Sequence, residues 1–106
     1  MLKTIPSQKR NSESSTLFQS VLGSSSRIKV LDMLITGRDL DYSISDIAAA
    51  AGISRATFYH MLNQMIDEKV IIPTRKIGRM QLFRINAKNS SISMLIDFYD
   101  SLVEKG

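Results

Sequence analysis

The chain has 106 residues, no cysteine and a formal net charge of +4. This length suits a single domain with a core of its own, and the lack of cysteine excludes a disulfide framework, a thiolate metal site and a cysteine nucleophile. No apolar run approaches the length of a membrane span, and the first residues lack the apolar core of a signal peptide. We therefore expect a cytoplasmic protein with no membrane partner.

The positive charge is concentrated in one part of the chain. Residues 54–88 hold seven Lys and Arg against two Asp and Glu, whereas residues 16–53 and 89–106 are both net negative. A polyanion would be attracted to the segment 54–88.

Residues 1–15 are polar and serine-rich, so they cannot bury enough apolar surface to order themselves. We expect them to form a flexible basic tail that precedes one domain, residues 16–106. The basic groups Lys3, Lys9 and Arg10 either follow DNA phosphates or only keep the tail soluble, and the sequence leaves both readings open.

Two helices are expected next. A short apolar stripe over residues 16–22 is too short to be a stable helix alone and must dock on the rest of the domain. The serines at 24–26 offer caps for a second helix, which runs through Ile35 and is ended by Gly37. Its inward face is formed by Ile28, Leu31, Leu34 and Ile35.

Residues 43–71 are predicted to form two helices joined by a tight turn. We expect Ser45 to cap the first helix, and the four alanines that follow allow a second helix to cross closely. Gly52 supplies the left-handed conformation that ends the first helix, and Ser54 caps the second. Helical spacing predicts a buried face on the second helix made of Phe58, Met61, Leu62, Met65 and Ile66.

The opposite face of this second helix, residues 54–68, carries hydrogen-bonding groups where most exposed helices carry Glu and Lys. Such groups can donate to and accept from base edges and phosphates, as a recognition helix in the major groove must. The candidate DNA-binding residues of this helix are Ser54, Arg55, Ala56, Thr57, Tyr59, His60 and Asn63.

After Val70 the spacing of the apolar residues changes from that of a helix to that of a strand. A turn at Gly78 and Arg79 then predicts a β-hairpin. Residues 42–44 are expected to add a brief first strand. The hairpin forms a basic wing over residues 75–84 that contacts the DNA backbone or the minor groove. Its candidate residues are Arg75, Lys76, Arg79 and Arg84, although a charged hairpin is also a common defence of an exposed sheet edge.

A last helix, capped by Asn89 or Ser90, carries an apolar stripe broader than a small core requires. Pairing with a second subunit would bury the excess, so we expect a homodimer. The predicted dimerisation residues are Leu17, Phe18, Ile92, Leu95, Ile96, Tyr99, Leu102 and Val103.

The order helix, helix, turn, recognition helix, wing and C-terminal helix resembles the winged helix-turn-helix regulators, most closely the ArsR-like group of bacteria and archaea. The resemblance covers residues 21–85 and includes VLGSSSRIKVLDML, SISDIAAAAGIS and RATFYHMLNQMIDEKVI. It implies a mainly α fold with a small β-hairpin. The chain lacks the ligand sets of the metal-sensing relatives, and Lys69 stands where many relatives carry glycine between recognition helix and wing.

These observations favour a sequence-specific, DNA-binding transcriptional regulator that binds double-stranded DNA without a metal or other cofactor. Two alternatives remain: an architectural or partition-type DNA-binding protein, and a winged helix used for protein–protein assembly. An enzyme is not expected, because the sequence holds no phosphate-binding glycine loop and no recognisable catalytic motif.

Overall fold

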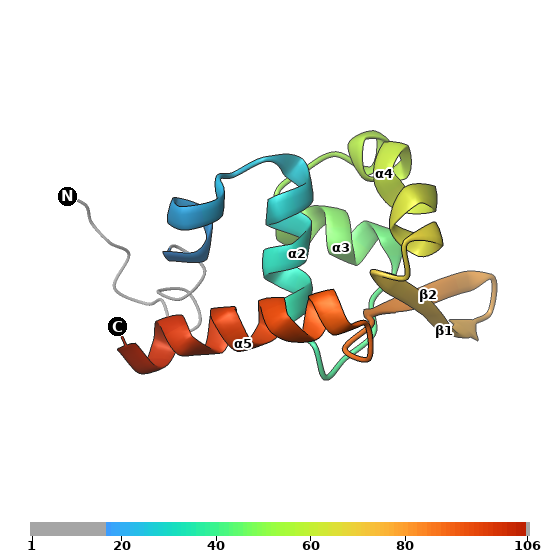
Figure 1. Ribbon diagram of the computed structural model, residues 1–106. Helices are drawn as coiled ribbons and strands as arrows, with labels where there is room; N and C mark the ends of the chain where they lie inside the picture. The colour runs from blue at the N-terminus through green and yellow to red at the C-terminus, as the bar shows by residue number, and fades with distance from the viewer. Residues whose placement is uncertain (1–16, 106) are drawn as a thin grey trace.

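The computed structural model describes residues 17–105 and shows a small helical body from which one hairpin projects (Figure 1). A short helix over residues 17–22 is followed by α2 (Ser26–Thr36), α3 (Ile44–Ala51), α4 (Arg55–Asp67), β1 (Ile71–Ile77), β2 (Met80–Ile85) and α5 (Ser90–Lys105). The predicted element order and the mainly α class are confirmed. The basic tail predicted over residues 1–15 lies outside the described residues.

Helix starts follow the predicted capping chemistry with one exception. The Ser54 hydroxyl accepts from the Thr57 amide at 3.0 Å, and the Asn89 side chain accepts from the first amides of α5. The prediction that Ser45 caps α3 is wrong, because the Ser43 hydroxyl accepts from the Asp46 amide at 3.1 Å. Ser43 is the last extended residue before α3, so the helix begins two residues earlier than predicted.

Helices α3 and α4 end in the same way. A residue just beyond each helix adopts a left-handed conformation: Gly52, directly after α3, with φ 75°, and Lys69, one residue after the C-cap Glu68 of α4, with φ 62°. In both cases this residue and the next donate their amides back into the last turn, from Ile53 to the Ala48 carbonyl at 3.0 Å and from Val70 to the Met65 carbonyl at 2.9 Å. At each helix end, the two bonds donated by consecutive amides form a Schellman motif, which satisfies the last carbonyls of that helix.

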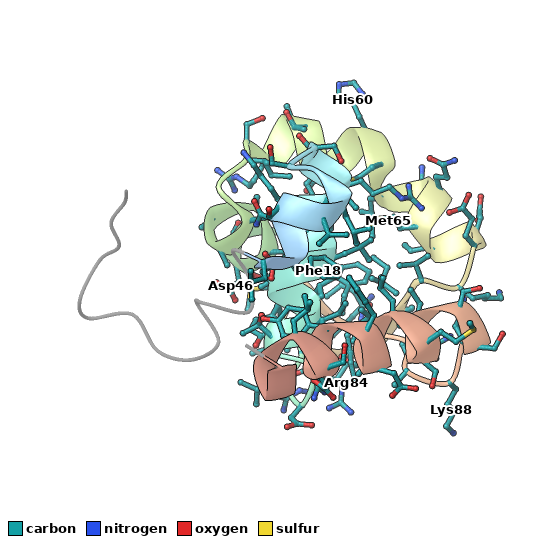
Figure 2. All side chains as sticks on the ribbon, turned by 60° about the vertical axis from the view of Figure 1, so that its left-hand side comes forward. Phe18, Asp46, His60, Met65, Arg84 and Lys88 are labelled. Atoms are coloured by element: carbon teal, nitrogen blue, oxygen red, sulfur yellow. The ribbon has the colours of Figure 1, made fainter. Side chains whose placement is uncertain are left out.

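The core lies where the helices meet the inner face of the hairpin, and Phe18 and Met65 point into it (Figure 2). The predicted inward faces of α2 and α4 are confirmed. Two further α2 residues, Val30 and Asp32, are also buried and were not predicted. The fully buried side chains are Phe18, Val30, Leu34, Ile35, Ile47, Phe58, Met65, Ile71 and Ile85.

β1 and β2 form an antiparallel pair in which Ile71 faces Ile85 and Ile77 faces Met80. The register shifts between Pro73 and Lys76, which marks an irregularity in the middle of β1. Of the predicted first strand, Tyr42 alone pairs with β2, through two backbone hydrogen bonds of 2.8 Å to Phe83. This predicted first strand is limited to Tyr42 because α3 already begins at Ile44.

Candidate nucleic-acid interface

The outer face of α4 carries the predicted polar residues in exposed positions. Arg55, Tyr59 and Asn63 follow one another at four-residue intervals on this face, and Tyr59 is 56% exposed. His60 points away from the body (Figure 2). One face of the helix therefore presents a guanidinium, a phenol, an imidazole and an amide to solvent.

Three of the predicted residues at the start of α4 already have a local role. The hydroxyl of Ser54 donates to the Thr57 hydroxyl at 2.9 Å and accepts from the Thr57 amide. These groups define the start of the helix, which fixes where the N-terminal turn points. Arg55, in that first turn, donates one hydrogen bond of 3.2 Å to the Ser45 hydroxyl of α3, which leaves its other donors for a ligand.

Helix α4 is held against the body at both ends. Its start follows α3 after a short turn at residues 52–54, and the two helices pack against each other. At its end, Arg27 of α2 forms an ion pair with Glu68 and donates to Gln64 at 3.4 Å. The exposed face of α4 is thus presented by a supported helix.

The wing is anchored to the loop before α3 by Arg75, in the middle of β1. This side chain donates to both carboxylate oxygens of Asp41, at 3.0 and 3.3 Å, and Thr74 donates to the same carboxylate at 2.7 Å. The hydrogen bonds from Arg75 and Thr74 lower the pKa of Asp41 below its usual value. Since Asp41 neutralises part of its charge, Arg75 is a fixed and partly compensated cation.

The other three wing cations differ in position. Lys76 and Arg79 are exposed at the end of the hairpin. Arg84 pairs with Ile72 across the hairpin and lines a groove against α5 that also includes Arg38 and Asp97. In Figure 2 Arg84 lies beside α5, on the side of the molecule opposite His60. The structure therefore separates Arg84 from the surface that joins α4 to the wing tip, and we leave Arg84 out of the interface proposed below.

The fold was compared with solved structures. The homodimeric winged helix-turn-helix DNA-binding domain of Mb0332 from Mycobacterium bovis, described as a possible ArsR-family transcriptional regulator, matches with a TM-score of 0.55 and 17% identity over 99% of this chain and 92% of that one. The chain has a winged helix-turn-helix fold. ZitR of Lactococcus lactis, solved in apo form as a double mutant, matches with a TM-score of 0.49 and 16% identity over 98% of this chain and 85% of that one. No protein-family model and no curated protein matches the sequence.

In this fold α3 and α4 take the places of the positioning and recognition helices, and the β1–β2 hairpin takes the place of the wing. The resemblance to ArsR-like regulators drawn from the sequence is therefore supported at the level of the fold. In the part of the chain that the structure describes, no three His, Asp or Glu side chains are grouped to hold a metal ion. None of the described helices is both long and apolar enough to span a membrane.

Three of the predicted dimerisation residues lie in the core of the single winged helix. Phe18, Ile92 and Tyr99 are at most 5% exposed. The ring of Phe18 lies 5.4 Å from that of Tyr99, whose hydroxyl shares a hydrogen bond with Thr36 of α2. These three side chains attach α5 and the first helix to the body, and their part in subunit contacts stays a prediction.

The remaining predicted dimerisation residues are less buried. Leu17, Leu95, Ile96 and Leu102 are half-buried, and the side chain of Val103 lies outside the described residues. Large exposed apolar side chains lie on the same two helices, with Val21 62%, Leu22 40% and Met94 71% exposed. The first helix and the outer side of α5 thus make one of the apolar surfaces that stay uncovered in a single chain.

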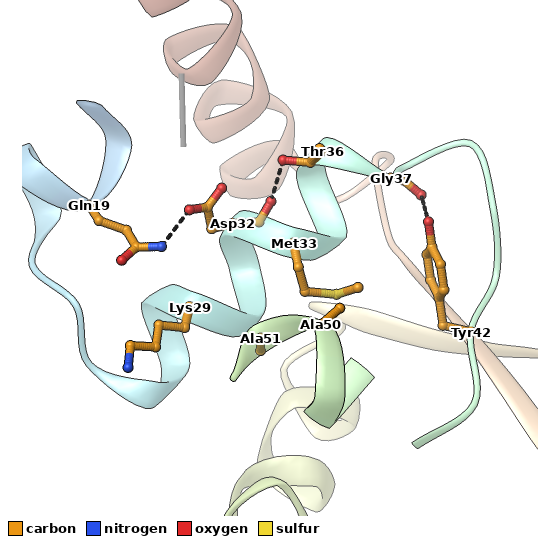
Figure 3. A pocket seen from close by; sticks show the side chains of 9 residues that line it. All are labelled: Gln19, Lys29, Asp32, Met33, Thr36, Gly37, Tyr42, Ala50 and Ala51. Carbon is orange, nitrogen blue, oxygen red and sulfur yellow. Dashed lines mark hydrogen bonds between the residues drawn. The ribbon is translucent and has the colours of Figure 1, made fainter. Parts of the chain in front are cut away.

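A cavity of about 400 Å³ lies between α2 and α3 (Figure 3). At its edge the buried Asp32 accepts a hydrogen bond of 2.6 Å from Gln19 of the first helix. The Tyr42 hydroxyl donates to the Gly37 carbonyl at 3.1 Å, and burial, together with two nearby aspartates, raises the pKa of Tyr42 above its usual value. These bonds hold the first helix and the loop before α3 on α2.

Several contacts that position the interface could not be predicted from the sequence. Asp41 and Arg75 are 34 residues apart, and Asn86 and Asn89 donate to the Lys69 carbonyl at 3.0 and 3.1 Å from beyond the hairpin. Each pairing depends on how the hairpin folds back on the body. A local pattern of residues could have suggested only the type of each side chain.

Proposed function

We propose that this chain is a transcriptional regulator that binds double-stranded DNA as a homodimer. Helix α4 enters the major groove, and Lys76 and Arg79 of the wing contact the phosphate backbone or the minor groove. The observation that carries the proposal is the exposed face of α4 from Arg55 to Asn63, which holds no carboxylate and continues toward a hairpin that holds none either. The fold neighbour described as a homodimeric DNA-binding domain supports it.

Sequence preference would come from Arg55, Tyr59, His60 and Asn63. Arg pairs through two hydrogen bonds with guanine and Asn with adenine, and each such pair discriminates by about 1–3 kcal/mol. Arg55 stands in the first turn of α4, the part of a recognition helix that enters the groove. Its single bond to Ser45 is exposed and can be exchanged for bonds to a base edge.

The homodimer would form through the first helix and the exposed side of α5. A two-fold axis through this contact relates two copies of α4 and predicts a roughly palindromic site. Its half-sites would lie about 10 base pairs apart, or a small multiple of that.

Arg55→Ala tests the mode of binding. A preferred duplex is first selected from random DNA by the wild type, and both proteins are then titrated on this duplex and on a scrambled one. We expect Arg55→Ala to lose about tenfold or more in affinity on the preferred duplex and little on the scrambled one, since it removes a base contact. Arg84→Ala is the matched control, because it deletes an exposed arginine on the opposite side and should change neither titration.

The other outcomes select the alternatives. An equal loss on both duplexes, with a smaller salt dependence, would mean that Arg55 touches only a phosphate. A wild type that binds every duplex alike would favour an architectural or partition-type protein. A wild type that binds no duplex would contradict the proposal and leave protein–protein assembly as the use of this fold.

A further inference from the structure

The tip of the wing carries two large apolar side chains in the open. Ile77 and Met80 are 53% and 46% exposed, and they are direct partners across the hairpin. Directly opposed residues of an antiparallel pair lie on the same face, so the two side chains form one apolar spot. The turn between them is two residues long, and Gly78 adopts φ 62° in its first position. A positive φ at this position is the type II′ pattern, which keeps the tip narrow and requires glycine.

This apolar spot is flanked by positive charge. Lys76 and Arg79 adjoin Ile77 and Met80 in the sequence, and residues 71–85 contain no acidic residue. A second copy of the same hairpin would be repelled by this charge, whereas a polyanion would be attracted. The spot therefore suits a surface that has phosphates on both sides of an apolar floor, and the minor groove of DNA is such a surface.

We propose that Ile77 and Met80 act as an apolar wedge that enters the minor groove beside the major-groove site of α4 and bends the duplex. This inference rests on the proposed DNA binding and adds to it a deformation of the DNA. Paired strands lie about 4.8 Å apart before their side chains are counted, and the minor groove of B-DNA is only about 6 Å wide. The tip can enter to the depth of these side chains only where the groove opens.

Opening the groove unstacks a base step, and this is easiest at flexible pyrimidine–purine steps such as TA and CA. The wedge therefore selects such a step at a fixed distance from the bases read by α4, although no side chain of the wing reads a base edge. Lys76 and Arg79, which flank the spot, would hold the phosphates on either side of the opened groove.

Bending is measured by energy transfer between dyes on the two ends of a duplex of about 30 base pairs, a length on which a bend is readily detected. The wild type should shorten the distance between the duplex ends. Ile77→Ser combined with Met80→Ser should restore the distance of the free duplex and weaken binding about tenfold, since two apolar contacts are lost. The slope of log affinity against log salt should fall by no more than the contribution of the two phosphate contacts of Lys76 and Arg79, because the other phosphate contacts are unchanged.

Two controls separate the wedge from a general loss of apolar surface. Ile77→Leu combined with Met80→Leu keeps the apolar volume and should keep the bend. Leu40→Ser removes a side chain that is 61% exposed in the loop before α3 and should change neither bend nor affinity. Thermal unfolding of all variants shows whether the hairpin still folds.

The outcomes distinguish this inference from the proposed function. A wild type that binds the duplex without bending it would overturn the wedge and leave DNA binding intact. A serine variant that still bends the duplex would overturn it as well. A serine variant that alters the sedimentation of the DNA-free protein, with the bend unchanged, would assign the apolar spot to contacts between copies of the chain. Absence of any binding by the wild type would remove the proposed function itself.

Discussion

Lys69 occupies a backbone conformation that favours glycine, and replacing it should stabilise the protein. Its φ of 62° is the only positive φ of a non-glycine residue among the described positions. A non-glycine residue in the left-handed region destabilises the folded state by roughly 1–2 kcal/mol. Glycine removes this strain but has greater freedom in the unfolded chain, which lowers the free energy of unfolding by roughly 0.5–1 kcal/mol. Lys69→Gly should therefore raise the free energy of unfolding by roughly 0.5–1 kcal/mol, which for a domain of this size is a rise of roughly 3–6 °C in Tm.

The matched control is Lys69→Ala, which loses the same charge and the same aliphatic stem but keeps the Cβ atom. Neither substitution touches the Lys69 carbonyl, which accepts from Asn86 and Asn89. Thermal unfolding followed by circular dichroism at one fixed protein concentration compares the variants. We expect the glycine variant to melt above the wild type and the alanine variant at or below it. If the two variants melt together, the backbone strain assigned to this position is not real.

Three further predictions concern other parts of the molecule. Gly37→Ala should lower the free energy of unfolding by about 1–3 kcal/mol, since a Cβ there would lie 2.0 Å from the Tyr42 hydroxyl oxygen; an unchanged Tm would contradict this. The carboxyl of Asp41 should titrate below its usual pKa in an NMR titration and return toward it in Arg75→Ala, because Arg75 is the largest cause of the shift. The folded-state pKa of Asp41 is the lowered one, so its contribution to stability is present above the usual carboxyl pKa and is lost as the pH falls through the lowered value. Met94→Lys combined with Val21→Lys should shift a dimer toward monomer in light scattering, whereas Leu40→Lys, an equally exposed position on another surface, should not; unchanged mass in the double variant would place the subunit contact elsewhere.

Local sequence signals predicted most of the recognition unit. Gly52 and Ser54 act through their nearest neighbours, and the buried side of α4 follows from helical spacing alone, so both could be predicted without the fold. The start of α3 could not, because the pairing of Tyr42 with Phe83 keeps the chain extended as far as Ser43. The position of an N-cap depends on where the preceding extended segment ends, as well as on the presence of a serine.

The candidate site was predicted less completely than the fold. The distribution of charge along the sequence located the wing but could not separate Arg84 from Arg79, since that separation depends on how α5 packs beside Arg84. An apolar stripe likewise does not say which surface covers it. The first helix of the same chain covers Tyr99 through Phe18, so part of the surface predicted for a second subunit is used within one chain. Both questions depend on contacts between residues far apart in the sequence.

The surface that meets DNA can be mapped residue by residue. Amide chemical shifts of the isotope-labelled protein are recorded before and after addition of a short duplex selected by the wild type. We predict that the largest changes fall in residues 54–63 and 76–80, with little change in the groove that Arg84 shares with α5. Changes concentrated in that groove, with α4 unaffected, would contradict the assignment of α4 as the recognition helix.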